Sequence, residues 1–523
     1  MTERLLRSTA TVAFGTGLSR VLGLVREVLM AVIFGTSLAK SAFDVAFRIP
    51  NLFRRLFGEG ALSAAFVPVF TEAREKEGPA AANQLFGRIG TLLAAVLLII
   101  VGLGVLVLLG LEKTWSLGPK ASAVIPLLRV MLPYVFFICL VALSMGALNS
   151  LGHFAVPAFT PILLNLVWIA SLLWICPRFG ASPDEQIFGL ALGILAAGAL
   201  QLLVQIPVLM KFGIRPSLSF RLNDARVRRV LMLVGPAALG VGVHQVNVVI
   251  DGILALWVGD WAPAALTYAE RMIYLPLGII ATALGTVLLP AFSKQVARED
   301  VPEMIATLGA SLKNILMIML PATVGLIVLA RPIVRLVFNW EGGLFDESSE
   351  LYTSRAMVFY AGGLVVFSLY KVIVPAFYAN QDMRTPVRIG LYTVALNLVL
   401  NIIFILTWPE GYQHAGLALA TVISSAVNCA VLGRLLHLRY GNPGWTDILK
   451  SFGAAAVGSL IMGFVVLFCL GSVQKGFAGA ALNAKWVQAA SVGVSIFAGM
   501  AIYGLWLFVI SRDTMKTLIR RGR

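Results

Sequence analysis

The sequence predicts an all-α polytopic membrane protein with about fourteen transmembrane helices. Of its 523 residues, 59% are hydrophobic and only 13% are charged, and the mean hydropathy is +0.89. Soluble domains hold roughly 45–50% apolar residues. Apolar stretches of roughly 20 residues, each long enough to cross a hydrocarbon layer of ~30 Å, recur from one end of the chain to the other.

The first apolar stretch is expected to be a retained span and not a signal peptide. Arg20, Arg26 and Glu27 interrupt it, and no small-residue cleavage site ends a short apolar core. The expected spans cover residues 9–35, 41–70, 85–111, 121–148, 156–177, 186–210, 230–258, 263–292, 303–329, 348–379, 385–407, 413–438, 448–471 and 486–510.

The net charge of +16 is better explained by membrane topology than by nucleic-acid binding. Basic residues gather in the short loops on one side of the spans, for example at Arg226, Arg228 and Arg229. Because cytoplasmic loops carry an excess of Lys and Arg, this pattern predicts a multi-pass membrane protein with both termini in the cytoplasm.

The spans are expected to form two six-helix lobes in the same orientation. Residues 65–70 are echoed at 287–292, and residues 165–167 at 397–399. Parallel repeats of this kind occur in transporters whose substrate sites lie between the lobes. The expected divisions are an N-lobe at 1–212 with helices 1–6, a cytoplasmic linker at 213–229, a C-lobe at 230–440 with helices 7–12, and helices 13–14 with a basic tail at 441–523.

Helix-breaking residues fall at matching places in the two lobes. Pro50 lies in the second span and Pro276 in the eighth, and Gly235-Pro236 lies in the seventh. Broken helices can expose backbone groups to a cavity, whereas the structural alternative is a simple kink.

Ionisable residues concentrate in three of the expected spans. Each would cost ~2.5–3.5 kcal/mol at a lipid-facing helix centre, so they must face protein, water or a ligand. Arginines outnumber acids in this set, and the guanidinium fork suits phosphate and carboxylate groups. The structural alternative is a set of interhelical ion pairs. The residues are Arg20, Arg26, Glu27, Asp44, Arg48, Arg54, Arg55, Glu59, Glu270 and Arg271.

Helical spacing predicts partners for some of these arginines. Asp44 and Arg48, and likewise Arg55 and Glu59, stand four residues apart, which is the spacing of intrahelical ion pairs. Arg20, Arg26 and Arg54 are expected to lack a close partner in their own helices. Lys40 is expected to extend to the membrane surface.

A second, polar group is a candidate cation site. Carboxylate, amide and hydroxyl oxygens suit Na⁺ or a proton relay, whereas interhelical hydrogen bonding is the structural alternative. Its members are Asp251, Asn397, Asn401 and Thr421. The four cysteines and four histidines show no metal-ligand or catalytic spacing, and no nucleotide motif occurs, so no cofactor is expected.

Motifs along nearly the whole chain resemble the MurJ (MviN) lipid II flippase family. The match begins with Ser19-Arg20-Val21-Leu22-Gly23 and Pro50-Asn51-Leu52 followed by Arg54-Arg55, and continues through Glu59-Gly60-Ala61. Later motifs are Gly235-Pro236-Ala237, Tyr268-Ala269-Glu270-Arg271 and Gln381-Asp382. Two positions depart from the family pattern: Ser41 and Tyr274 stand where acids are often found.

The resemblance implies the multidrug/oligosaccharidyl-lipid/polysaccharide (MOP) exporter fold with two added C-terminal helices. It also implies export of lipid II, the undecaprenyl-diphosphate-linked peptidoglycan precursor, by alternating access in cell-wall biogenesis. The expected substrate-binding residues are Arg20, Arg26, Glu27, Arg48, Asn51, Arg54, Arg55, Glu59, Glu270 and Arg271. Coupling to Na⁺ or to the membrane potential is expected. The expected partners are lipid II and membrane lipids, with cell-wall synthesis proteins as candidates, and the protein is expected to be monomeric.

Two alternatives remain at this stage. The first is a cation-coupled exporter of drugs or of another lipid-linked oligosaccharide, although an exporter of cationic drugs would favour an acidic cavity. The second is a membrane enzyme acting on isoprenoid diphosphates, which would need acidic residues to hold Mg²⁺. Asp346, Glu347 and Glu350 form the only acidic loop cluster without an evident basic neighbour in the sequence.

Overall fold

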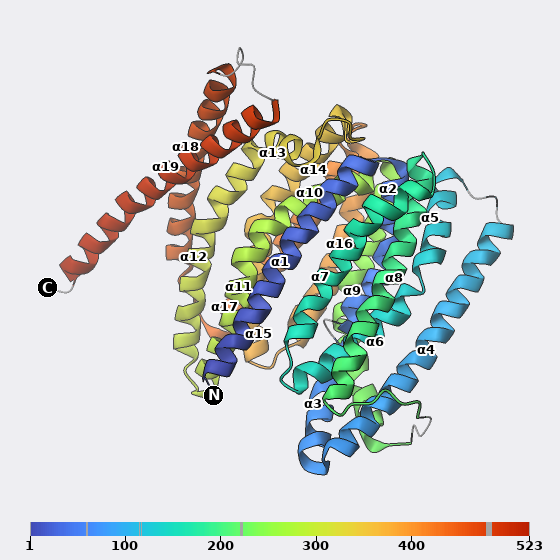
Figure 1. Cartoon of the computed structure of the whole chain (residues 1–523). Helices are drawn as coiled ribbons and strands as arrows, with labels where there is room; N and C mark the ends of the chain where they lie inside the picture. Colours follow the sequence, from blue (N-terminus) through green and yellow to red (C-terminus); the bar gives the residue numbers. More distant parts are fainter. Residues whose placement is uncertain are drawn as a thin grey trace. The chain divides into compact units, whose positions relative to one another are not determined.

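The computed structural model describes residues 2–58, 61–114, 116, 118–219, 223–476 and 484–521, and the regular elements in these residues are all helices (Figure 1). They separate into two compact units, residues 1–264 and 265–523. The expected all-α fold is therefore confirmed. The lobe boundaries expected at residues 212 and 230 stay a prediction, because the compact units place the seventh expected span with the first six.

Unit 1 contains nine α-helices and three short turns of other helical types among its described residues. The α-helices are α1 Thr2–Phe34, α2 Leu38–Phe53, α3 Ala61–Glu77, α4 Pro79–Thr114, α5 Pro119–Met131, α6 Tyr134–Ser150, α7 Ala155–Ala170, α8 Pro183–Lys211 and α9 Ala225–Val258. The turns are the π-helical η1 Arg54–Gly58 and η2 Ser171–Ile175, and the 3₁₀-helical η3 Cys176–Arg178. Helix α4 lies at the edge of this unit and exposes many apolar side chains (Figure 1).

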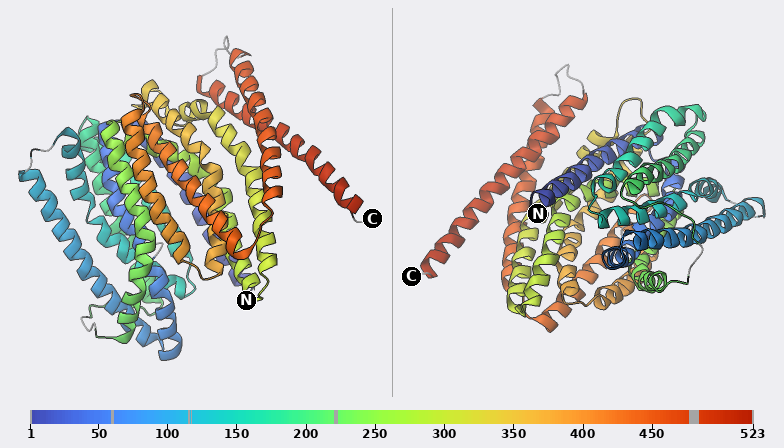
Figure 2. Two further views of the ribbon diagram at one scale, coloured as in Figure 1. Left: turned by 180° about the vertical axis from the view of Figure 1, so that it is seen from behind. Right: turned by 60° about the horizontal axis from the view of Figure 1, so that its bottom comes forward.

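Unit 2 begins at Ala265, inside α10 Ala262–Pro276. Figure 2 shows α18 and α19 packed side by side, as their contacts also indicate. The remaining elements are η4 Leu277–Ala281, α11 Thr282–Ala297, α12 Val301–Val328, α13 Ala330–Phe338, α14 Glu347–Gly362, α15 Leu364–Ala379, α16 Arg384–Thr407, α17 Gln413–Tyr440, α18 Trp445–Gly476 and α19 Ala484–Arg521.

Eight of the described helices are long and apolar enough to cross a membrane, and the number rises to ten if the bent pairs α5–α6 and α14–α15 each form one span. The four other expected spans correspond to α1, to α2–η1–α3, to α9 and to α10–η4–α11. Three of these four carry the ionisable residues noted in the sequence. Every expected span therefore coincides with a helical segment.

Two of the helix breaks expected from proline are present at corresponding places. The π-helical turn η1 follows Pro50, and η4 begins directly after Pro276. Proline removes a backbone N–H donor and crowds the preceding turn, and π-helical turns are frequent at functional sites. In contrast, α9 continues through Gly235 and Pro236 as one helix, so the interruption expected there is absent.

Ion pairs connect the start of α9 and the polar segment before it to α3 and α4 of the same unit. Asp224 caps α9, accepts a hydrogen bond from the Arg226 backbone N–H at 2.8 Å, and forms an ion pair with Arg88 of α4. Arg226 also pairs with Glu77, at 2.9 Å, and Arg229 pairs with Glu72 at 2.7 Å. These contacts fix the path of the chain into α9.

Substitution of Asp224 by Asn tests this attachment. Hydrogen bonds from Arg226 hold the pKa of Asp224 at about 2. Asn keeps the capping function but loses the charge, so D224N should lower the free energy of unfolding by up to about 2 kcal/mol at pH 7. Because the folded pKa lies below the unfolded one, the difference should persist above pH ~4 and disappear as the pH falls toward about 2.

Melting of the detergent-solubilised protein, followed by circular dichroism at several pH values, measures this difference. A D224N deficit that is the same at pH 7 and pH 3 would contradict the role of the charge.

Candidate functional site

The ionisable residues of α1 in unit 1 are held by partners from α1 and α7. Arg26 is buried, forms an ion pair with Glu27 at 2.7 Å, and donates to Oδ1 of Asn165 at 3.1 Å. Its guanidinium carbon lies 4.1 Å from the centre of the Trp168 ring, which is a cation–π contact. Arg26 thus has the intrahelical partner that spacing did not predict.

Asn165 is itself oriented by α1. Its side-chain NH₂ donates to the backbone carbonyl of Ser19 at 3.0 Å, while its oxygen accepts from Arg26. Trp168 packs edge-on against Phe43 and Phe47 of α2, each with ring centres 5.5 Å apart. The Arg26 guanidinium is therefore placed against an aromatic wall where α1, α2 and α7 meet.

Arg20 differs from Arg26. Its side chain is exposed, and it forms no hydrogen bond or ion pair with any residue that the structure describes. The expectation that Arg20 lacks a close partner is confirmed within this part of the chain.

The pairing in α2 also differs from the expected one. Lys40 is 1% exposed and forms an ion pair with Asp44 at 2.5 Å. The expected Asp44–Arg48 pair does not form: Arg48 instead donates from Nη1 to the backbone carbonyl of Val248 in α9, at 2.5 Å. Spacing allowed either neighbour of Asp44, and the buried position of Lys40 decides the outcome because a buried ammonium needs a partner.

Arg48 reaches α9 because Gly252 leaves room for it. A Cβ atom at residue 252 would lie 2.6 Å from Nη1 of Arg48, closer than packing permits. The glycine therefore allows a guanidinium to lie flat against the α9 backbone, a role that the sequence gave no reason to assign to it.

Arg54 and Arg55 lie in the π-helical turn η1, after the break at Pro50. Arg54 donates from Nε to Oδ1 of Asn51 at 2.9 Å, and Arg55 donates to Oε1 of Gln245 in α9 at 3.4 Å. Both acceptors are neutral amides. Among the described residues, Arg48 and Arg55 form no ion pair. Glu59, the expected partner of Arg55, lies outside the described residues.

Unit 1 thus places five arginines on α1, α2 and η1, and the acceptors of Arg48 and Arg55 are uncharged oxygens. Such arginines keep the ability to attract a negatively charged group. Arg26 and Arg54 both lie within electrostatic range of the Tyr134 hydroxyl, a buried group that has no hydrogen-bond partner among the described residues. The five are Arg20, Arg26, Arg48, Arg54 and Arg55.

Glu270 and Arg271 lie in unit 2, on α10. The preceding Tyr268 is buried against Phe338 and Phe345, with ring centres 5.0 and 5.6 Å away, which fixes this turn of α10. Glu270 is half-buried and Arg271 is exposed. Whether these two residues share a site with the arginines of unit 1 stays a prediction.

Three members of the candidate cation site come together within unit 2. Asn397 donates to Thr421 at 3.5 Å, and Asn401 donates to Asn397 at 3.1 Å. Both asparagines are almost fully buried. Asp251, the fourth member, lies on α9 in unit 1, where it accepts from Asn247 at 3.2 Å. These contacts also satisfy the structural alternative of hydrogen bonds between helices.

The acidic loop cluster has basic partners after all. Glu350 is 1% exposed, and it pairs with Arg331 at 2.6 Å and with Arg335 at 3.6 Å. Asp346 caps α14 by accepting from the Ser349 backbone N–H. The cluster therefore stabilises α13 and α14, and no group of three metal-binding side chains occurs among the described residues.

The family model described as "Lipid II flippase MurJ" matches residues 30–485. The chain belongs to the lipid II flippase MurJ family. A Vibrio cholerae serotype O1 protein named "Probable lipid II flippase MurJ" is 37% identical over 451 residues, with 84% of each chain covered. A Burkholderia cenocepacia protein named "Lipid II flippase MurJ" is 35% identical over 468 residues, covering 87% of this chain and 88% of that one.

Solved structures agree with membership of the MurJ family. One described as "Lipid II flippase MurJ, inward closed conformation" matches with a TM-score of 0.78 and 26% identity, covering 96% of this chain and 99% of that chain. A MATE transporter of the MOP superfamily matches with a TM-score of 0.66 at 14% identity, covering 83% and 96%. The second match shows the fold alone, and it confirms the expected MOP architecture.

Two features of this chain differ from the MurJ family pattern noted above. Ser41 is buried, and its hydroxyl accepts a hydrogen bond from the Ala264 backbone N–H at 3.3 Å, so it helps to position the start of α10. Tyr274 is exposed on α10.

Replacement of Lys40 tests the buried pair in α2. K40M should leave Asp44 buried without its main partner and should lower the free energy of unfolding by up to about 3 kcal/mol, somewhat below the usual cost because Arg48 lies nearby. The double variant K40M/D44N removes both charges and should recover most of that loss. Thermal melts of the three proteins measure the coupling, and additive losses would contradict the ion pair.

Proposed function

We propose that this chain is a flippase that moves lipid II from the cytoplasmic to the outer leaflet of the bacterial inner membrane. The observation that carries the proposal is the family match over residues 30–485, which extends across both compact units. The relatives at 37% and 35% identity carry the same function in their names. The protein is a multi-pass membrane protein by its apolar helices.

The arginines of unit 1 supply the chemistry that such a substrate needs. Lipid II carries a diphosphate, and guanidinium groups bind phosphate oxygens through paired, charge-assisted hydrogen bonds. Arg48 and Arg55 are bound by neutral oxygens and Arg20 by no described group. Their charges therefore remain available for the diphosphate. Glu270 and Arg271 complete the proposed substrate-binding set from unit 2.

The membrane potential is the proposed source of energy. An anion that moves outward across an inside-negative membrane gains ~2.3 kcal/mol per charge per 100 mV. A basic site that neutralises the diphosphate allows the substrate to enter the protein without requiring ATP. Coupling to Na⁺ through Asp251, Asn397, Asn401 and Thr421 is a secondary proposal, supported by the convergence of the last three residues.

The transport cycle proposed here is alternating access between two lobes, with no covalent change to the substrate. The proposed orientation has both termini in the cytoplasm, and the excess of basic residues in the loops on one side supports it. The protein is proposed to act as a monomer, with cell-wall synthesis proteins as candidate partners.

Depletion of the protein in cells without a redundant flippase tests the function. Lipid II should accumulate and become inaccessible to a degrading reagent added outside the cytoplasmic membrane. Unchanged accessibility, with peptidoglycan synthesis intact, would refute the proposal.

Arg20 offers the cleanest test of the site because its side chain is exposed and its loss leaves no described acceptor unpaired. R20Q should lower lipid II translocation about 10- to 100-fold, the value of one charge-assisted hydrogen bond, with normal expression and melting temperature. The matched control is R388Q, which changes an exposed arginine on α16 of unit 2. Equal translocation by R20Q and R388Q would remove Arg20 from the site.

A further inference from the structure

A pocket of about 480 Å³ lies within unit 2, among α12, α15, α17 and α18. Its walls are mostly apolar and include Leu316 of α12, Leu369 of α15 and Ile448 of α18. Along α17 the lining residues are small, namely Ala426, Ala430 and Gly433. The small side chains leave space beside α17 that larger residues would fill.

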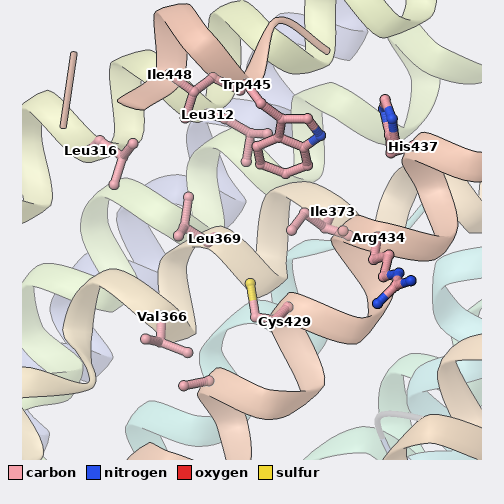
Figure 3. A pocket seen from close by; sticks show the side chains of 13 residues that line it. Leu312, Leu316, Val366, Leu369, Ile373, Cys429, Arg434, His437, Trp445 and Ile448 are labelled. Carbon is pink, nitrogen blue, oxygen red and sulfur yellow. The ribbon is translucent and has the colours of Figure 1, made fainter. Parts of the chain in front are cut away.

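One side of this pocket is polar. Arg434 and His437 from the end of α17 lie there. Figure 3 shows Trp445, from the first turn of α18, between His437 and Leu316, whereas the guanidinium of Arg434 lies farther along α17 and points away from His437. The indole of Trp445 approaches α17 closely because residue 433 is glycine: a Cβ there would lie 3.3 Å from the ring. His437 and Trp445 are therefore neighbours, and Arg434 adds a positive charge to the lining of the same pocket.

These three side chains have donor groups that the protein does not use. Arg434 is exposed and forms no hydrogen bond or ion pair with a described residue. Nδ1 of His437 is buried and has no partner among the described residues. The indole N–H of Trp445 likewise meets no acceptor in the described part of the chain, although its backbone N–H donates to Asn442 at 3.2 Å.

Two acids in the same unit already have other partners. Asp382 pairs with Arg439 at 2.5 Å, and Asp447 pairs with Lys450 at 3.7 Å. No acidic residue lines the pocket. A cluster of unused donors without an acid requires an acceptor from outside the protein, and an anionic oxygen satisfies it best.

The location of the pocket suggests which molecule supplies that oxygen. Arg434, His437 and Trp445 lie at the ends of two apolar spans joined by the short loop 441–444. Tryptophan and basic residues at such ends lie at the level of the lipid head groups, and basic pockets between transmembrane helices bind anionic lipid head groups. The apolar residues of the pocket can then contact the chain of the same lipid.

The volume sets the size of the apolar part of the ligand. At ~30 Å³ per group, the share of a water molecule in the liquid, a pocket of about 480 Å³ holds roughly sixteen such groups. This is the size of one fatty acyl chain and far less than an undecaprenyl chain. A membrane phospholipid therefore fits better than the tail of lipid II.

We propose that this pocket binds one anionic glycerophospholipid. The phosphate accepts hydrogen bonds from His437 and Trp445 and is attracted by the positive charge of Arg434, and one acyl chain lies against Leu316, Leu369 and Ile448. The site is built entirely within unit 2, it shares no residue with the proposed lipid II site, and its occupancy does not require transport. The bound lipid would fill the space beside Ala426 and Ala430 of α17.

Native mass spectrometry of the delipidated full-length protein tests the proposal, with the anionic phosphatidylglycerol as the probe and phosphatidylcholine, a zwitterion of zero net charge, as the comparison. The wild-type protein should bind one phosphatidylglycerol at least about fivefold more tightly than phosphatidylcholine. R434Q should weaken the binding of phosphatidylglycerol by a similar factor. A430F, which fills the groove from an exposed position on α17, should abolish the tight site.

R388Q is the matched control, because Arg388 is also an exposed arginine without a described partner, but it does not line the pocket. It should bind phosphatidylglycerol like the wild type. Helix content measured by circular dichroism shows whether each variant is folded. Unchanged binding by folded R434Q and A430F would overturn the proposal. Displacement of phosphatidylglycerol from the tight site by equimolar undecaprenyl phosphate would assign the pocket to an isoprenoid lipid instead.

Discussion

Charged groups inside membrane-spanning helices need partners, because hydrocarbon offers them none. In unit 1 this requirement is met in two ways. Lys40 with Asp44 and Arg26 with Glu27 form close ion pairs in nearly dry surroundings. Arg48 and Arg55 instead donate to neutral oxygens of α9, which secures their positions without cancelling their charge. The first arrangement stabilises the bundle, and the second leaves a positive field that an anionic substrate can use.

Much of the fold followed from the sequence because membrane-spanning helices have a simple physical signature. Fourteen apolar stretches coincide with helical segments, and Pro50 and Pro276 precede π-helical turns at corresponding places. Each copy of the short echo at 165–167 and 397–399 holds an asparagine that binds a polar side chain: Asn165 accepts from Arg26, and Asn397 donates to Thr421. The sequence pattern did not predict that α9 continues through Pro236. Neighbouring helices and backbone adjustments determine whether such a proline breaks a span.

The sequence indicated which spans carry ionisable residues, but it did not indicate the partners of those residues. Spacing along one helix predicted an ion pair between Asp44 and Arg48. In the structure Asp44 pairs with the buried Lys40, and Arg48 donates a hydrogen bond to the backbone carbonyl of Val248. The roles of Trp168, Gln245 and Gly252 depend on contacts between helices far apart in sequence. A single sequence contains no signal for such contacts. The acidic cluster at Glu350 was misread for the same reason, because Arg331 and Arg335 reach it across a turn in space.

The proposed role of the arginines of unit 1 is to carry an anionic lipid across the membrane. Translocation of fluorescent lipid II by the purified protein in sealed vesicles, with an imposed potential of either sign, measures this most directly. Transport should be faster when the potential drives anions toward the outer face. Replacement of Arg55 by Gln should lower the transport rate about tenfold or more. A transport rate that changes neither with the sign of the potential nor with the loss of Arg55 would contradict this role of the arginines.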